Sequence, residues 1–259
     1  GSGLVGSEMC IRDSAFQNAG YSTGHIGKWH MGGGRDVHNA PSIKNYGFDE
    51  YISTYESPDP EPAITATKWI WSDKDSVKRW RRTEYFVDKS IEFVKKHKGE
   101  PFFLNLWPDD MHTPWVPEFK QKERKSWETQ EAFAPVLAEM DKQLGRFIKT
   151  LDELGVGENT IIIFTSDNGP APSFKSVRSA YLRGTKNSLY EGGIRMPFIV
   201  RYPKKIKAGQ VNNESVLCAV DLYPTLCSIA GIKTEKGYKG DGQNYSKVPV
   251  SYTHLTLPT

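Results

Sequence analysis

Two oxygen-bearing side chains, Asp167 and Asn168, stand next to each other directly after the apolar run Thr160–Thr165. A carboxylate and an amide oxygen are ligands that a hard cation such as calcium prefers, whereas an Asp-His pair would favour zinc or manganese. The alternative is an Asx-type turn that closes the strand, with Gly169 and Pro170 completing it. We therefore treat the pair as a candidate calcium site and keep the turn as the simpler interpretation.

Lys28 and His30 form a second candidate pair, separated by one tryptophan. In an extended segment, residues two apart point the same way, so both side chains can face one ligand. Lysine offers a fixed positive charge to an oxyanion, and histidine exchanges a proton near neutral pH. The alternative is a solvated lysine beside a histidine that caps a turn.

His112 and Lys186 each lie in a segment with unusual backbone chemistry. His112 is followed by Thr113 and a proline, which restricts the loop, so it can serve as a general acid or as a structural hydrogen-bonding group. Lys186 lies between Gly184 and the Gly192-Gly193 pair, and glycines permit close backbone approach. The alternative for Lys186 is a surface lysine beside a packing loop.

The apolar pattern predicts which elements carry these residues. Apolar residues recur three or four apart from about Ala132 to Leu154, which predicts an amphipathic helix that stops at Gly155. The run Thr160–Thr165 is predicted to be a strand buried on both faces. We predict further helices and strands over Arg82–Lys98, Pro101–Trp107, Pro197–Tyr202 and Asp221–Ala230, and we expect Gly20–Gly32 to be too rich in glycine for a regular element.

Alternation of helix and strand predicts an α/β fold with a largely parallel mixed sheet flanked by helices. Functional groups of such a fold are expected just past the carboxyl ends of strands. His112 follows the Pro101–Trp107 strand in this way, and Asp167 follows the Thr160–Thr165 strand. We therefore expect Lys28, His30, His112, Asp167, Asn168 and Lys186 to converge on one pocket at the carboxyl edge of the sheet.

Composition limits the classes of function. The chain has 259 residues, of which 37% are hydrophobic and 25% charged, as in a globular protein with one core, although two small domains would also fit. With 34 basic and 31 acidic residues, the net charge of +3 is too even to predict a nucleic-acid partner. No apolar run is long enough for a membrane span. The three cysteines include no CxxC pair, which leaves buried free thiols or a Cys218–Cys227 disulfide.

The segments GYSTGHIGKWHMG, HTP, IIIFTSDNGP and LRGTKNSLYEGGIRMPFIVRYP occur in that order. Together they closely resemble the type I sulfatases of the alkaline phosphatase superfamily. The resemblance extends to VLCAVDLYPTLCSIAGI and to Gly240–Gly242, so it covers about Ala15 to Ser246. It implies an alkaline phosphatase/sulfatase-like fold, incomplete at its N-terminus, and hydrolysis of a carbohydrate or aryl sulfate ester.

The resemblance also implies roles for individual residues. In this family a cysteine in a C-x-P-S-R motif is oxidised to formylglycine, whose hydrate attacks the sulfur while calcium holds the sulfate oxygens. By resemblance, Asp167 and Asn168 are calcium ligands, Lys28 holds the formylglycine hydroxyl and His30 takes its proton. His112 and Lys186 bind the sulfate, and one of them protonates the departing alkoxide. The family also implies a periplasmic or secreted location, whereas the oligomeric state stays open.

Several departures from the family pattern matter for activity. No C-x-P-S-R motif occurs, and Cys10, followed by Ile11, Arg12 and Asp13, does not fit it. The family's first strand, which ends in two metal-binding aspartates, has no counterpart, and we interpret Asp109-Asp110 as local to the His112 loop. We therefore expect this chain to be inactive or nearly so.

Other interpretations stay open at this point. One is a phosphodiesterase or phosphonate monoester hydrolase of the same superfamily, against which Asn168 argues because it stands in place of a metal-binding histidine. Another is a non-catalytic binder of sulfated glycans. We expect residues 15–247 to form a partial catalytic domain and residues 1–14 and 248–259 to be non-native ends. Ile52–Trp80, with its tryptophans Trp69, Trp71 and Trp80, is our candidate for a substrate rim.

Overall fold

The computed structural model describes residues 13–32, 39–67, 69–120, 128–234 and 239–247. They form two compact units. The first unit holds the described residues up to 154 together with 232–234, and the second holds 155–231 and 239–247.

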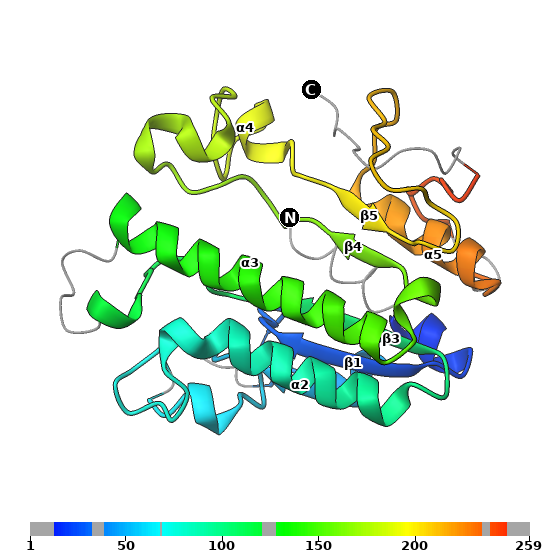
Figure 1. Ribbon diagram of the computed structural model, residues 1–259, viewed down its shortest axis with the longest axis horizontal. Helices are drawn as coiled ribbons and strands as arrows, with labels where there is room; N and C mark the ends of the chain where they lie inside the picture. Colours follow the sequence, from blue (N-terminus) through cyan, green and yellow to red (C-terminus); the bar gives the residue numbers. More distant parts are fainter. Residues whose placement is uncertain (1–12, 33–38, 68, 121–127, 235–238, 248–259) are drawn as a thin grey trace. The chain divides into compact units, whose positions relative to one another are not determined.

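A three-stranded parallel sheet is the centre of the first unit (Figure 1). Its strands are β1 (Ser22–Gly27), β2 (Glu50–Ser53) and β3 (Phe102–Trp107), in the order β2-β1-β3. In β1, Gly24 lies opposite Glu50 on one side and Leu104 on the other. The parallel pairing confirms the α/β class and the predicted strand at Pro101–Trp107.

The prediction that Gly20–Gly32 is irregular is wrong, because β1 is the central strand of this sheet. The packing around Gly24 explains why this strand contains a glycine at that position. A Cβ at this position would lie 2.9 Å from the Phe93 ring and 3.0 Å from the Leu104 side chain. The glycine therefore lets the neighbouring helix pack closely on the sheet, a tertiary requirement that strand propensity does not reveal.

Two long helices pack on one another, and one of them, α2, packs on this sheet (Figure 1). Helix α2 (Arg82–His97) contacts β1 and β3 through a buried face that includes Phe86, Val87 and Phe93. Helix α3 (Gln130–Glu153) lies against α2, and the Thr129 hydroxyl oxygen caps its first turn by accepting a 3.2 Å hydrogen bond from the Ala132 amide. Both helices confirm the sequence prediction.

The segment predicted to form a substrate rim contributes mainly to the core. Trp71 is buried in a cluster with Tyr55, Ile70 and Val116, and Trp80 packs against it. Only Trp69 has most of its surface accessible, with 52% exposed. Two of the three tryptophans are thus structural, and the rim prediction is wrong for them.

The second unit contains a two-stranded antiparallel sheet of β4 (Ile162–Phe164) and β5 (Ile199–Arg201). Its helices are α4 (Glu191–Ile194) and α5 (Leu222–Ala230), and Gly231 ends α5 in the left-handed region with φ of 71°. β4, β5 and α5 lie where the sequence predicted them, whereas α4 was not predicted. The expected burial of the 160–165 strand on both faces is wrong, because Ile162 is half-buried and Phe164 is 39% exposed. In the described part of this unit, β4 pairs with β5 alone, so the strand lacks a wider sheet around it.

Short 3-10 helices connect these elements, and one of them, η3, leads directly into α2. They are η1 (Ile43–Tyr46), η2 (Pro62–Ile64), η3 (Arg79–Arg81), η4 (Glu118–Lys120), η6 (Gly157–Asn159), η7 (Phe174–Ser179) and η8 (Ala219–Asp221). Cys218 is exposed and Cys227 buried, and both are free thiols, so the alternative of a disulfide between them is wrong. None of the described helices combines the length and apolarity needed to cross a membrane.

Candidate functional site

The carboxyl ends of β1 and β3 bring two candidate segments to the same edge of the first unit's sheet. The Lys28 amide donates a 2.9 Å hydrogen bond to the Trp107 carbonyl oxygen. Gly27 has φ of 121°, and a Cβ there would lie only 2.0 Å from that oxygen, so the two strands end in close backbone contact. The Lys28–His30 segment and the loop leading to His112 thus leave neighbouring parallel strands side by side.

The backbone of the Lys28–His30 segment differs in part from the extended form assumed for it. Trp29 is buried against Ile43 and Phe48, while Lys28 is half-buried, as alternation in an extended chain predicts. His30 is exposed, but its φ of 49° lies in the left-handed region. The extended geometry therefore ends before His30, and the argument that both side chains point the same way does not hold.

His112 is exposed in a tight loop after β3. Its amide donates a 3.1 Å hydrogen bond to the Asp109 carbonyl oxygen, and the Thr113–Pro114 peptide bond that follows is cis. The His112 Nδ1 atom lies 2.7 Å from the Thr113 carbonyl oxygen. Because a carbonyl can only accept, Nδ1 carries the proton of this bond, and Nε2 is the nitrogen that gains or loses a proton. With Nδ1–H held by this carbonyl, the ring can act as a general acid through Nε2 only when both nitrogens are protonated.

A buried ionic cluster lies at the base of the His112 loop. Arg79 Nη1 contacts Asp109 Oδ2 at 2.6 Å, and Arg82 Nη1 contacts the same oxygen at 2.7 Å. Asp110 is buried as well, and its Oδ2 accepts hydrogen bonds from the amide and hydroxyl of Thr83 at the start of α2. Both aspartates are therefore used by neighbours in the fold, which confirms that the Asp109-Asp110 pair is local.

The two aspartates have opposite shifts in pKa. Burial alone would raise the pKa of Asp109, but the charges of Arg79 and Arg82 overcome it and lower the pKa to about 2. Burial raises the pKa of Asp110, which Arg79 opposes, and the negative charge of Asp109 raises it further. Asp109 is thus the fixed anion that balances the two arginines.

In the second unit, backbone hydrogen bonds dock the Ser166–Pro170 segment on the segment that contains Lys186. The Gly169 amide donates to the Gly193 carbonyl oxygen at 2.8 Å, and the Lys186 amide donates to the Pro170 carbonyl oxygen at 2.8 Å. A Cβ on Gly169 would lie 2.0 Å from the Gly192 carbonyl oxygen, so the contact requires a glycine. The structure thus brings Asp167, Asn168 and Lys186 into one loop cluster.

The Asp167-Asn168 pair fits calcium in the type of atom that it offers. The Asp167 carboxylate is exposed, and its Oδ1 lies 3.4 Å from the Ser166 hydroxyl. The Asn168 Nδ2 group donates to the Gly169 carbonyl oxygen at 2.9 Å, which leaves Oδ1 as the atom suited to a cation. Calcium takes about six to eight oxygens, so these two side chains supply only part of a shell. Across the described residues, no group of three or more His, Cys, Asp or Glu side chains gathers as a metal site would require.

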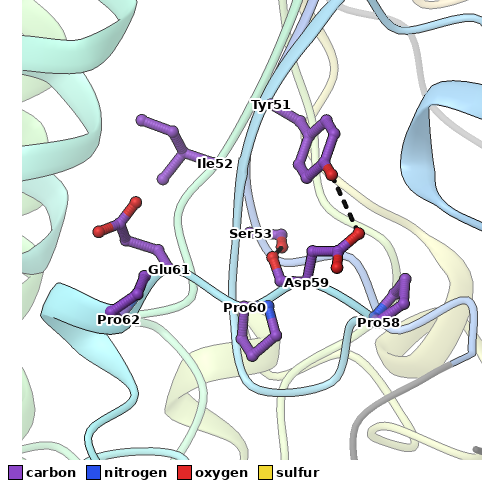
Figure 2. Close-up of a pocket in the computed structure, with 8 residues that line it drawn as sticks. All are labelled: Tyr51, Ile52, Ser53, Pro58, Asp59, Pro60, Glu61 and Pro62. Atoms are coloured by element: carbon purple, nitrogen blue, oxygen red, sulfur yellow. Dashed lines mark hydrogen bonds between the residues drawn. The ribbon is translucent and has the colours of Figure 1, made fainter.

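A cavity of about 460 Å³ opens at the carboxyl end of β2 (Figure 2). The Tyr51 hydroxyl donates a 3.0 Å hydrogen bond to Asp59 Oδ2 at its wall, as the figure shows. Ser53 lies opposite Gly27 in the sheet register, so the cavity and the Lys28 segment share one sheet edge. Apart from Tyr51, the lining residues belong to the Ile52–Trp80 segment, which was predicted from the sequence as a candidate substrate rim. The lining residues are Tyr51, Ile52, Ser53, Pro58, Asp59, Pro60, Glu61 and Pro62.

The six predicted residues divide between the two units. Lys28, His30 and His112 follow neighbouring strands in the first, while Asp167, Asn168 and Lys186 share a loop cluster in the second. That all six meet in one pocket stays a prediction. Sequence reasoning missed Arg79 and Arg82, for which the only signal was a basic pair before a predicted helix. Residues 1–12 and 248–259, which include Cys10 and most of the two predicted end segments, lie outside the described residues.

Residues 14–232 match the sulfatase family, and the chain belongs to that family.

Individual relatives agree. An N-acetylgalactosamine-6-O-sulfatase of Bacteroides thetaiotaomicron is 26% identical over 291 residues, which cover 83% of this chain and 55% of the relative. An arylsulfatase of Hemicentrotus pulcherrimus is 28% identical over 259 residues, which cover 92% of this chain and 46% of the relative. The chain thus spans about half the length of these curated relatives. In fold, it is similar to the crystal structure of the PsFucS1 sulfatase from Pseudoalteromonas sp., with a TM-score of 0.72, 23% identity, and coverage of 96% of this chain and 56% of that chain.

Proposed function

We propose that this chain carries a large part of the active site of a sulfuric ester hydrolase that acts on a sulfated carbohydrate. One observation carries the proposal, namely the docking of the Ser166–Pro170 segment on Gly193 and Lys186 through hydrogen bonds of 2.8 Å. The docking brings the candidate oxygen ligands of the IIIFTSDNGP segment next to the LRGTKNSLYEGGIRMPFIVRYP segment, which supplies a lysine. The names of the two relatives, one for N-acetylgalactosamine 6-sulfate and one for aryl sulfates, support sulfate esters as the substrate class. They do not favour a phosphonate monoester hydrolase or a non-catalytic binder.

The residues that would bind the ester are His112 and Lys186. Sulfate carries its charge on non-bridging oxygens, and the departing alkoxide develops charge as the S–O bond breaks. A lysine ammonium stabilises the first charge, and a histidine Nε2–H supplies a proton to the second. Removing one such group typically lowers the rate about 100- to 1,000-fold.

Lys28 and His30 would serve the nucleophile. In this family the nucleophile is a formylglycine, which supplies a hydrated aldehyde, and the chain has no C-x-P-S-R motif from which to make it. Lys28 Nζ would hold the hydroxyl of that group by a charged hydrogen bond, and the His30 imidazole would accept its proton. We accordingly expect this chain by itself to bind esters without turning them over.

Asp167 and Asn168 would hold calcium through Oδ1 or Oδ2 of the carboxylate and Oδ1 of the amide. Bound calcium would neutralise charge on the sulfate oxygens. The docked backbone at Gly169 supports this role because it fixes the pair beside the Lys186 segment. Export to the periplasm or outside the cell is a further proposal, drawn from the family alone.

A binding experiment with matched variants tests the proposal. Calorimetric titration of the chain in calcium buffer should show binding of N-acetylgalactosamine 6-sulfate or 4-nitrophenyl sulfate and none of unsulfated N-acetylgalactosamine. Lys186→Ala should weaken the affinity about 10- to 100-fold, as expected for a hydrogen bond to a charged group. Lys207→Ala is the control, because Lys207 is an exposed lysine in the same unit.

Three results would overturn the proposal: no binding of either sulfate ester, equal binding of sulfated and unsulfated sugar, or the same affinity in both lysine variants. A parallel assay of 4-nitrophenol release tests the expectation of inactivity. Turnover by this chain would contradict that expectation while leaving the class of substrate intact.

A further inference from the structure

Arg79 is a buried charged residue of the first unit to which the proposed function assigns no role. It is only 3% exposed. It lies in η3, thirty residues before Asp109 at the start of the His112 loop, and no role was predicted for it from the sequence. Its Nη2 atom donates to the carbonyl oxygens of Asp109, at 2.8 Å, and of His112, at 3.2 Å. Its Nη1 atom donates to Asp109 Oδ2 at 2.6 Å. We infer that Arg79 is a positioning residue that fixes the backbone of the His112 loop, an inference that rests on the proposed function for the role of His112.

The geometry of this contact explains why it bears on the imidazole. The Asp109 carbonyl oxygen that accepts from Arg79 also accepts the His112 amide at 3.1 Å, so one guanidinium closes both ends of the turn. The imidazole Nδ1 is bonded to the next carbonyl, that of Thr113, at 2.7 Å. Any rotation of the His112 peptide therefore carries the ring with it, and Arg79 restrains that rotation.

A planar fork is needed for this task. Arg79 binds a carboxylate through one nitrogen and two backbone carbonyls through the other, whereas a lysine would have to make all three contacts from a single nitrogen. The rest of the loop is held elsewhere, because the Trp115 Nε1 group donates to the Met111 carbonyl oxygen at 3.2 Å. Arg79 thus acts on the two residues at the ends of the turn.

The neighbouring arginine has a different task, which separates positioning from general stability. Arg82 shares Asp109 Oδ2 with Arg79, but its other nitrogen, Nη2, donates to the carbonyl oxygens of Ile64 and Ile70 at 2.9 and 2.6 Å. It therefore anchors the backbone at Ile64 and Ile70. Within the cluster, Arg82 bonds to backbone of the core, and Arg79 bonds to backbone of the His112 loop.

Arginine-to-lysine variants of Arg79 and Arg81 make a matched test. Arg81 lies two residues away in the same short helix, but it is exposed and pairs with Glu84 on the surface at 2.6 Å. In histidine-labelled chain, Arg79→Lys should move or double the His112 ring resonances, whereas Arg81→Lys should leave them in place. The His97 resonances report whether the fold is intact.

Titration with inorganic sulfate adds a readout that a purely structural role would not move. The sulfate affinity measured from the His112 resonances should fall about tenfold or more in Arg79→Lys, as expected when one charged hydrogen bond to the anion is misaligned. It should stay unchanged in Arg81→Lys. Arg79→Met should lower the sulfate affinity further, provided that this variant folds. If it does not fold, Arg79→Lys still tests the inference, because it keeps the positive charge and most of the buried volume.

The outcomes separate this inference from the proposed function. Wild-type resonances and wild-type sulfate affinity at His112 in a folded Arg79→Lys chain would overturn the inference. If sulfate moves no His112 resonance even in the wild type, the assignment of His112 to the ester is wrong. The ring resonances without sulfate then still decide whether Arg79 positions the loop.

Discussion

Gly169→Ala is the sharpest single test of how the second unit builds its loop cluster. The added Cβ would lie 2.0 Å from the Gly192 carbonyl oxygen and 2.7 Å from Gly193 Cα. Both are backbone atoms, so neither can rotate away as a side chain would. We expect the Ser166–Pro170 segment to lift from the Gly192-Gly193 backbone.

The magnitude follows from two contributions. Overpacking against atoms that cannot move costs about 1–3 kcal/mol. Separation also removes the Gly169–Gly193 hydrogen bond of 2.8 Å, worth about 1 kcal/mol. We therefore expect the second unit to lose about 2–4 kcal/mol in its free energy of unfolding, with weaker binding of calcium at Asp167 and Asn168.

Urea denaturation and amide hydrogen exchange of the Asp167–Pro170 and Lys186 amides measure this effect. Gly145→Ala is the control, because Gly145 lies inside α3 with no atom within 4 Å of an added Cβ. That variant should be neutral or stabilising by about 0.5–1 kcal/mol. A Gly169→Ala chain with wild-type stability and wild-type protection of the Lys186 amide would show that the docking is not as close as described.

Two further predictions concern the buried ionic cluster. Arg82→Met should destabilise the first unit by about 3–5 kcal/mol in urea denaturation, because it removes one of the two cations that balance buried Asp109 and the donor to the Ile64 and Ile70 carbonyls; a loss below about 1 kcal/mol would contradict the buried pairing. Asp109, with its pKa lowered to about 2, should contribute stability that is present above its unfolded pKa near 3.8 and lost as the pH falls toward 2. The full shift corresponds to about 2 kcal/mol, reduced by Asp110, whose raised pKa acts in the opposite direction. Urea midpoints that stay constant between about pH 5 and about pH 2.5 would refute this linkage.

The elements that sequence predicted well are those whose pattern is local. Helices α2 and α3 each show an apolar stripe, and β3 is an apolar run between a proline and a polar loop. The strand β1 was missed because its Gly24 is needed for close packing against Phe93, a residue sixty-nine positions away in the chain. Its neighbour β2 is four residues long and mixes Glu50 with apolar residues, so no periodicity marks it.

The candidate site shows the same division. The apolar run at Pro101–Trp107 was enough to predict that His112 follows a strand, whereas the strand before Lys28 was missed. The structure puts these two strands side by side. The pairing of Arg79 and Arg82 with Asp109 was not predictable, because nothing in the local sequence says which charges share a buried space. The direction of His30 was also beyond local reasoning, since its left-handed φ of 49° is set where the strand ends.

His112 and Lys186 belong to different units. A double-mutant cycle between them can decide whether both residues bind the same ligand. If both groups bind the same sulfate, removing one changes what the other contributes, and the coupling free energy should be about 0.5–3 kcal/mol. If they act at separate places more than about 7–10 Å apart, the two losses should add to within about 0.5 kcal/mol. The measurement is the affinity of 4-nitrophenyl sulfate for the wild type, His112→Ala, Lys186→Ala and the double variant, with Lys207→Ala in place of Lys186→Ala as the uncoupled control. Additive losses would refute the prediction of a single pocket while leaving each residue's own role intact. Coupling would instead mean that Lys186, in the loop cluster at Gly169, and His112, in the turn held by Arg79, bind the same sulfate.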